Sequence, residues 1–126
     1  TDAALEAIAE HCGERLRHLY FDDCTTVTDA GLKHISEACH QLQSLGFDSN
    51  VNWNHLSIAA IQGLLRSNPL LQEVRLQWEE EDADVLLTTL AESCPQLRHL
   101  DIYRLRRYTE VGIMTVMTAC SRLRTV

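Results

Sequence analysis

The feature that most constrains the fold is an internal repeat of about 26 residues. A cysteine, replaced once by asparagine, precedes a leucine by three or four positions and recurs at intervals of 26 to 29 residues. The five markers are Cys12, Cys39, Asn68, Cys94 and Cys120. A fixed period of this length is typical of proteins that stack similar supersecondary units, so we expect an array of units that share one continuous core.

Each period contains a strand pattern and a helix pattern. After each marker, the order is apolar, two variable, apolar, one variable, apolar, and alternation at the last three positions indicates a strand. The sets are Leu16-Leu19-Phe21, Leu42-Leu45-Phe47, Leu71-Val74-Leu76 and Leu97-Leu100-Ile102. Before each marker, apolar residues lie four and seven positions upstream, which is helical spacing. Each unit is therefore predicted to be a short strand followed by a helix.

The predicted helices begin at a recurring hydroxyl and acid pair. Thr1-Asp2, Thr28-Asp29 and Thr109-Glu110 offer a hydroxyl N-cap and a carboxylate near the positive end of the helix dipole. The third unit departs from this pattern, because it opens with Ser57-Ile58 and carries Asn68 in place of the cysteine.

These motifs carry a family resemblance over essentially the whole chain. The spacing Cys-x-x-Leu-x-x-Leu, with Thr28-Asp29-Ala30-Gly31-Leu32 opening a helix, resembles the cysteine-containing leucine-rich repeats best known from F-box proteins. The resemblance implies an α/β fold, a curved right-handed βα solenoid with parallel strands on the concave side and helices on the convex side. It also implies about 4.5 repeats of about 26 residues, and a repeat arc that captures substrates for a cullin-type ubiquitin ligase.

The domain prediction is a single leucine-rich repeat domain over residues 1–126, with both ends cut within a repeat. Thr1 stands at a predicted helix cap, and Val126 at the second core position of a predicted strand. Neither end has the polar cap that a solenoid terminus needs, so we expect a piece of a longer array.

Composition limits the partners. The net charge of −7 repels phosphate backbones, so no nucleic acid partner is expected. No apolar run approaches the length of a membrane span, and no leader precedes the repeats, so we expect no membrane partner. An intracellular location, cytoplasmic or nuclear, is predicted for a chain with five cysteines, an odd number.

The cysteines and histidines are predicted to be structural or solvated. Four cysteines share one repeat position at the end of a helix, where a small apolar side chain fits the core. The alternative is a metal-binding or catalytic pair, formed by Cys12 with His11 or by Cys39 with His40. The six histidines show no metal-ligand spacing. We therefore predict no catalytic residue, no metal, no cofactor and no enzyme activity.

An acidic run lies between the third strand and the next helix. It comprises Glu79, Glu80, Glu81 and Asp82, with Asp84 close by. A solvated loop that favours the following helix N-terminus is one interpretation, and a docking edge for a basic partner is the other.

Strand alternation names the residues that are predicted to face inward and to bind a partner. Two rows across the stack are expected to be Tyr20, Gly46, Arg75, Asp101 and Asp22, Asp48, Gln77, Tyr103. Trp78 between Arg75 and Tyr103 is predicted to be an exposed hot spot, with packing under a loop as the alternative. The full set of candidates is His18, Tyr20, Asp22, Asp23, Asp48, Glu73, Arg75, Gln77, Trp78, His99, Asp101, Tyr103 and Arg104.

The predicted function is a protein–protein interaction module that binds a protein partner through its concave strand face. Substrate recognition in an F-box-type ubiquitin ligase is its more specific form. A Skp-type adaptor would be a partner only if an F-box lies outside residues 1–126. The alternative is a structural or scaffold subunit of a large assembly without a ligase role.

Overall fold

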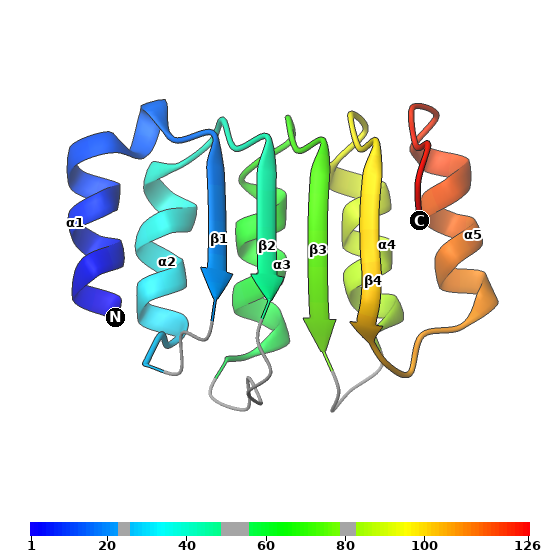
Figure 1. The fold of residues 1–126 in the computed structure, drawn as a ribbon, viewed down its shortest axis with the longest axis horizontal. Coiled ribbons are helices and arrows are strands. Elements are labelled where there is room, and N and C mark those ends of the chain that lie inside the picture. Colours follow the sequence, from blue (N-terminus) through cyan, green and yellow to red (C-terminus); the bar gives the residue numbers. More distant parts are fainter. Residues whose placement is uncertain (23–25, 49–55, 79–82) are drawn as a thin grey trace.

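Strands and helices alternate along the whole chain. The computed structural model describes residues 1–22, 26–48, 56–78 and 83–126. Figure 1 shows the strands side by side in one layer, the helices behind them in a second layer, and the two termini at opposite ends of the stack. The elements are α1 (Asp2–Cys12), a 3-10 turn (Gly13–Arg15), β1 (His18–Asp22), α2 (Asp29–Ala38), β2 (Ser44–Asp48), α3 (Ile58–Arg66), β3 (Glu73–Trp78), α4 (Asp84–Ser93), β4 (His99–Leu105) and α5 (Glu110–Ala119).

The four strands form one parallel sheet in the order β1-β2-β3-β4. The expected row Tyr20, Gly46, Arg75, Asp101 is confirmed as a series of paired positions. The second expected row is wrong at its last member, because Gln77 pairs with Arg104 and not with Tyr103. A bulge in β4 sets two residues, Ile102 and Tyr103, opposite Leu76 and shifts the register by one position.

The amino-terminal ends of the strands are joined by one repeated hydrogen-bond pattern. The carbonyl oxygen of Arg17 accepts from the amides of Gln43 and Ser44, which belong to the next unit. The carbonyls of Gln43 and Gln72 repeat this arrangement toward β3 and β4. The carbonyl of Arg98 in turn accepts from Arg124 and Thr125, and Thr125 bridges His99 in parallel. Residues 124–125 therefore run beside β4 as the beginning of another strand.

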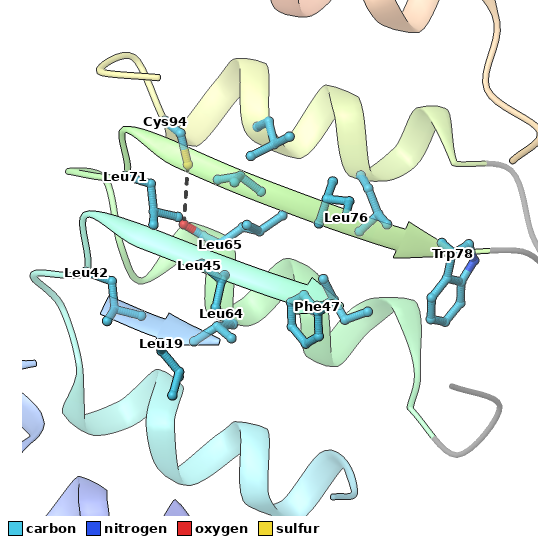
Figure 2. Close-up of a cluster of buried hydrophobic side chains, with 14 of the residues drawn as sticks. Leu19, Leu42, Leu45, Phe47, Leu64, Leu65, Leu71, Leu76, Trp78 and Cys94 are labelled. Atoms are coloured by element: carbon cyan, nitrogen blue, oxygen red, sulfur yellow. Dashed lines mark hydrogen bonds between the residues drawn. The ribbon is translucent and has the colours of Figure 1, made fainter. Parts of the chain in front are cut away.

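The core lies between the strand layer and the helix layer. Leucines at equivalent positions of successive units, such as Leu42, Leu71 and Leu97, are completely buried. Figure 2 shows side chains of β2 and β3 meeting those of α3 within one continuous cluster. The predicted α/β architecture is thus confirmed, and the apolar pattern is its physical cause. The helices of the described residues are too short to span a membrane, since the longest, α1, has 11 residues.

The repeat markers contact the backbone of the unit before them. Asn68 is completely buried: its side-chain oxygen accepts from the Leu42 amide at 3.1 Å, and its side-chain amide donates to the Leu64 carbonyl at 3.0 Å. The thiol of Cys120 lies 3.4 Å from the Cys94 carbonyl oxygen, one unit earlier. The marker thus contacts the backbone between units, and asparagine does so with the stronger hydrogen bonds.

A second link joins the helix beginnings. The carboxylate of Asp2 accepts from the amide of Thr28 at 2.7 Å and also from its hydroxyl, and Asp84 binds Thr109 in the same two ways. Asp29 accepts from the amide of Ser57 at 2.8 Å. The acid at the first position of a helix therefore contacts the residue that precedes the next helix.

The predicted hydroxyl caps are confirmed at two of three helices. Thr1 accepts from the amide of Ala4, and Thr109 accepts from the amide of Gly112. Thr28 precedes α2 as expected and its hydroxyl donates to Asp2, but its side chain makes no cap bond. The hydroxyl of Thr109, by contrast, both donates to Asp84 and accepts from the Gly112 amide.

Small residues accompany each acid. A Cβ atom added to Gly112 would lie 2.2 Å from the Asp84 carboxylate and 3.0 Å from Leu87. Gly31 stands equally close to Asp2, and Ala60 occupies the same helical position opposite Asp29. The acid–hydroxyl contact brings the two helix beginnings so close that little side-chain volume fits there.

One junction breaks the rule in a consistent way. α3 begins with Ile58 instead of an acid, and the following helix has Ala83 before it and the completely buried Leu86 at its third position. Apolar residues thus replace acid, hydroxyl and small residue together. The residue before each helix and its third residue therefore both suit the first residue of the preceding helix.

Candidate functional site

The strand face is the surface of the sheet that faces away from the helices. Alternation along the strands places on it His18, Tyr20, Asp22, Ser44, Gly46, Glu73, Arg75, Gln77, His99 and Asp101. Ser44, Gly46 and Gln77 are buried, whereas the other seven are exposed. Tyr20 is the large apolar group among the described side chains of this face, and it is 50% exposed.

Tyr20 lies across β2 toward Arg75. A Cβ atom on Gly46 would come within 2.6 Å of the Tyr20 ring, so the absence of a side chain there leaves the ring its place. The guanidinium carbon of Arg75 lies 6.0 Å from the centroid of the same ring, within cation–π range. Tyr20 and Arg75 therefore form one platform from two strands that are not neighbours, with Gly46 as its base.

A hollow of about 430 Å³ lies beside this platform. Glu73, Arg75, His99 and Asp101 line it together with Thr125 and Val126. The ring of His99 is fixed on one side, because its Nδ1 atom lies 3.0 Å from the Thr125 hydroxyl. The hollow thus brings carboxylate, guanidinium and imidazole groups to one place on the strand face.

The prediction that Trp78 is an exposed hot spot is wrong. Its side chain is only 6% exposed and lies on the core side of β3, as do Val74 and Leu76. Figure 2 shows the indole at the end of β3, beside the cluster of buried side chains. Its Nε1 atom has no hydrogen-bond partner within the described residues. The alternation continues to the last residue of β3 and directs Trp78 toward the core, away from the strand face.

Gln77 keeps its predicted face but is only 7% exposed, which leaves little of it for a partner. Asp23 and the acidic run Glu79–Asp82 lie outside the described residues, as do the side chains of Asp48, Tyr103 and Arg104. Their role in binding stays a prediction.

The described cysteines have the environment of structural thiols. Cys12, Cys39, Cys94 and Cys120 are free, and all but Cys12 are buried. Burial, with a smaller contribution from Cys120, raises the pKa of Cys94 to about 12, and burial also raises the pKa of Cys39 and of Cys120. Thiols with a raised pKa are poor nucleophiles and metal ligands at neutral pH.

The alternative pair of Cys39 and His40 gains no support. Both ring nitrogens of His40 lie near backbone carbonyl oxygens, those of Ser67 at 3.2 Å and Glu37 at 3.0 Å. Within the described residues, no three histidine, cysteine, aspartate or glutamate side chains gather as a metal site would require.

Comparison with known proteins defines the fold. No family model matches the chain. The chain is similar to the tropomodulin C-terminal domain of Caenorhabditis elegans, with a TM-score of 0.51 and 12% sequence identity over 96% of this chain and 92% of that one. At this identity the likeness shows the fold alone.

Sequence reasoning missed three contributors to the site. Gly46 was placed in the correct row, but its role in seating Tyr20 depends on how the ring leans, which a sequence pattern does not give. Thr125 and Val126 line the hollow from beyond the four complete strands. A signal for Gly46 existed, because glycine within a strand often marks a close approach.

Proposed function

We propose that the chain is a protein–protein interaction module that binds a protein segment on the strand face. The observation that carries this proposal is the Tyr20–Arg75 platform over Gly46. Tyrosine and arginine are enriched at binding hot spots because they bury a large area and keep polar handles. Both side chains here are exposed and face away from the helices.

The surroundings of the platform support the same proposal. Hot-spot residues work best when polar neighbours exclude water around them. His18, Asp22 and Glu73 are exposed around the platform, and the hollow lined by His99 and Asp101 offers room for a partner side chain. These charged groups would give specificity and orientation more than raw affinity.

The experiment compares partner capture by three purified forms of the chain. Proteins retained from a native lysate are quantified for the wild type, for Tyr20→Ala combined with Arg75→Ala, and for Lys33→Ala. Lys33 is exposed on α2 on the opposite side of the molecule and serves as the matched control. Melting curves check that each form is folded.

A partner retained by the wild type and the Lys33 variant, and lost by the double variant, is then titrated directly. Each single substitution on the platform should weaken its binding by about 2 kcal/mol or more, a hot-spot magnitude. Equal affinity of all forms would show that the platform is not the binding site.

A more specific form of the proposal is substrate recognition in an F-box-type ubiquitin ligase. The feature that favours it is the cysteine repeated at helix ends and buried at Cys39, Cys94 and Cys120. It requires an F-box in the same protein, and the test is copurification of a Skp-type adaptor with the protein in its native host. Its absence from stoichiometric complexes would remove the ligase role and leave the binding module.

The alternative is a permanent scaffold subunit of a large assembly. Size-exclusion profiling of a native lysate separates the two, because a scaffold subunit would leave little free protein. A mostly free pool favours a module that binds its partners reversibly.

A further inference from the structure

The two ends of the stack differ in their surface chemistry. α5 exposes Val111, Met114 and Met117, with exposed fractions of 74%, 57% and 51%, and Tyr108 and Val126 are exposed beside it. α1 exposes alanine and charged side chains, and it contributes no large apolar residue to the exposed set. Among the described residues, five of the eight large apolar side chains that are exposed lie at the carboxyl-terminal end, and this cluster marks an interaction surface.

Two residues of α5, Ile113 and Met114, stand at positions that contact the next helix in earlier units. At the fifth position of α3, Gln62 donates to Thr89 of α4 at 3.0 Å. At the fourth position of α4, Leu87 lies against Gly112 of α5. The corresponding residues of α5 are Met114 and Ile113.

The strand side of the same end is also open. A hollow of about 490 Å³ is lined by Ile102, Leu105, Tyr108, Ile113 and Val126, with Asp101 at its rim. Residues 124–125 already pair with β4 in the pattern that begins each strand. At this end, apolar side chains of the core, one face of α5 and the edge of the sheet are therefore all accessible.

Glu110 indicates what kind of helix fits. It is the first residue of α5. The first residues of α1, α2 and α4 are acids, and each of them binds the residue that precedes the next helix: Asp2, Asp29 and Asp84. In each of those junctions the next helix brings serine or threonine before its first residue and glycine or alanine at its third. The apolar junction at Ile58 brings Ala83 and Leu86 instead.

We propose that the end formed by α5 and residues 123–126 is a docking surface for one further strand–helix unit, whose helix opens with serine or threonine followed by a small third residue. Its strand would extend the pairing begun at Thr125, and its helix would cover Ile113, Met114 and Met117. The argument rests on continuity with the junction between α4 and α5, and is independent of binding on the strand face.

The chain provides matched test units from its own sequence. Leu123–Val126 correspond to Leu16–Leu19, so residues 20–48 joined after Val126 continue the repeat in phase and bring Thr28 and Gly31 opposite Glu110. Leu123–Val126 correspond equally to Leu71–Val74, so residues 75–103 form a unit of equal length that brings Ala83 and Leu86. Only the first unit has the helix beginning that suits an acid.

The two methionines of the chain, Met114 and Met117, report coverage directly. Both are exposed on α5, and oxidation of methionine by peroxide follows its exposure. With residues 20–48 attached, both should oxidise about tenfold more slowly than in the 126-residue chain, because the added helix covers them. With residues 75–103 attached, the rate should stay close to that of the unextended chain.

A reciprocal variant shows whether residues 75–103 fail to protect the methionines because they do not fold or because they do not match Glu110. Glu110→Ile recreates on α5 the apolar first position of Ile58, and residues 75–103 attached to this variant should then protect both methionines. Protection in the two matched combinations and not in the mismatched one supports the proposal. Equal protection by both units on the wild-type chain, or protection in neither matched combination, overturns it.

Discussion

The carboxylate of Asp84, the first residue of α4, accepts hydrogen bonds from both the amide and the hydroxyl of Thr109, 25 residues further along the chain. Asp2 and Thr28 repeat this contact at the other end of the stack. Two consecutive helices are thus joined at their beginnings by polar contacts, in addition to the apolar core that both helices share with the strand layer.

Removing this carboxylate should weaken the α4–α5 junction. Asp84→Ala is expected to lower the free energy of unfolding by about 1 kcal/mol, because it leaves the amide and hydroxyl of Thr109 without this acceptor. Urea denaturation measures the change. Thr88→Ala on the exposed side of the same helix is the control and should leave the midpoint nearly unchanged. Equal shifts would mean that the contact adds no stability.

The contact between Asp2 and Thr28 should be visible in a titration. Hydrogen bonds from the Thr28 side chain, and then from its amide, hold the pKa of Asp2 below its ordinary value of 3.8. A carboxyl group with a lowered pKa in the folded state stabilises the fold above pH 3.8, and this contribution is lost as the pH falls through the folded pKa. Asp2 is only partly buried, so solvent screens this contact and the effect on total stability is small.

Thr28→Val removes the largest cause and should raise the pKa of Asp2 toward 3.8, as measured by NMR of the carboxyl carbon. Thr26→Val, at an exposed position two residues earlier, is the control. An unchanged Asp2 titration in the Thr28 variant would contradict the assigned cause.

Two glycines on helices should respond oppositely to alanine. Gly112→Ala is expected to destabilise by about 1 to 3 kcal/mol, because its Cβ atom would meet Asp84 and Leu87. Gly63→Ala meets only the Ser36 hydroxyl at 4.0 Å, and should stabilise by up to about 1 kcal/mol through helix propensity. Thermal or urea unfolding of both variants decides. Asp84→Ala combined with Gly112→Ala should cost less than the sum of the two single changes.

The asparagine among the cysteine markers should not be exchangeable for cysteine. Asn68→Cys restores the majority residue of the repeat, yet it removes the acceptor of the buried Leu42 amide. We expect a loss of about 1 to 3 kcal/mol, the cost of an unsatisfied buried polar group. The reverse exchange, Cys94→Asn, tests whether the position accepts asparagine in general. A neutral Asn68→Cys would show that the consensus residue alone determines the fit.

The sequence predicts the layers, the strand order and most of the register, because the apolar spacing shows which face of each strand and helix packs in the core. The row from Tyr20 to Asp101 follows from counting. The exposed position predicted for Trp78 is wrong, because alternation with Val74 and Leu76 places an aromatic side chain in the core as readily as an aliphatic one. The role of Gly46 and the paired helix beginnings depend on distances between units, which no spacing within one unit encodes.

The bulge in β4 interrupts the regular rows of positions on the strand face, which affects how a partner could contact them. The positions Tyr20, Gly46, Arg75 and Asp101 follow one another across the sheet in equal steps of about 4.8 Å, the spacing of neighbouring strands. One row further on, the extra residue in β4 changes the phase, so Gln77 is followed by Arg104. A strictly periodic peptide would therefore match the first row and fall out of step in the next. This asymmetry would give an extended partner a single frame and a single direction in which to lie.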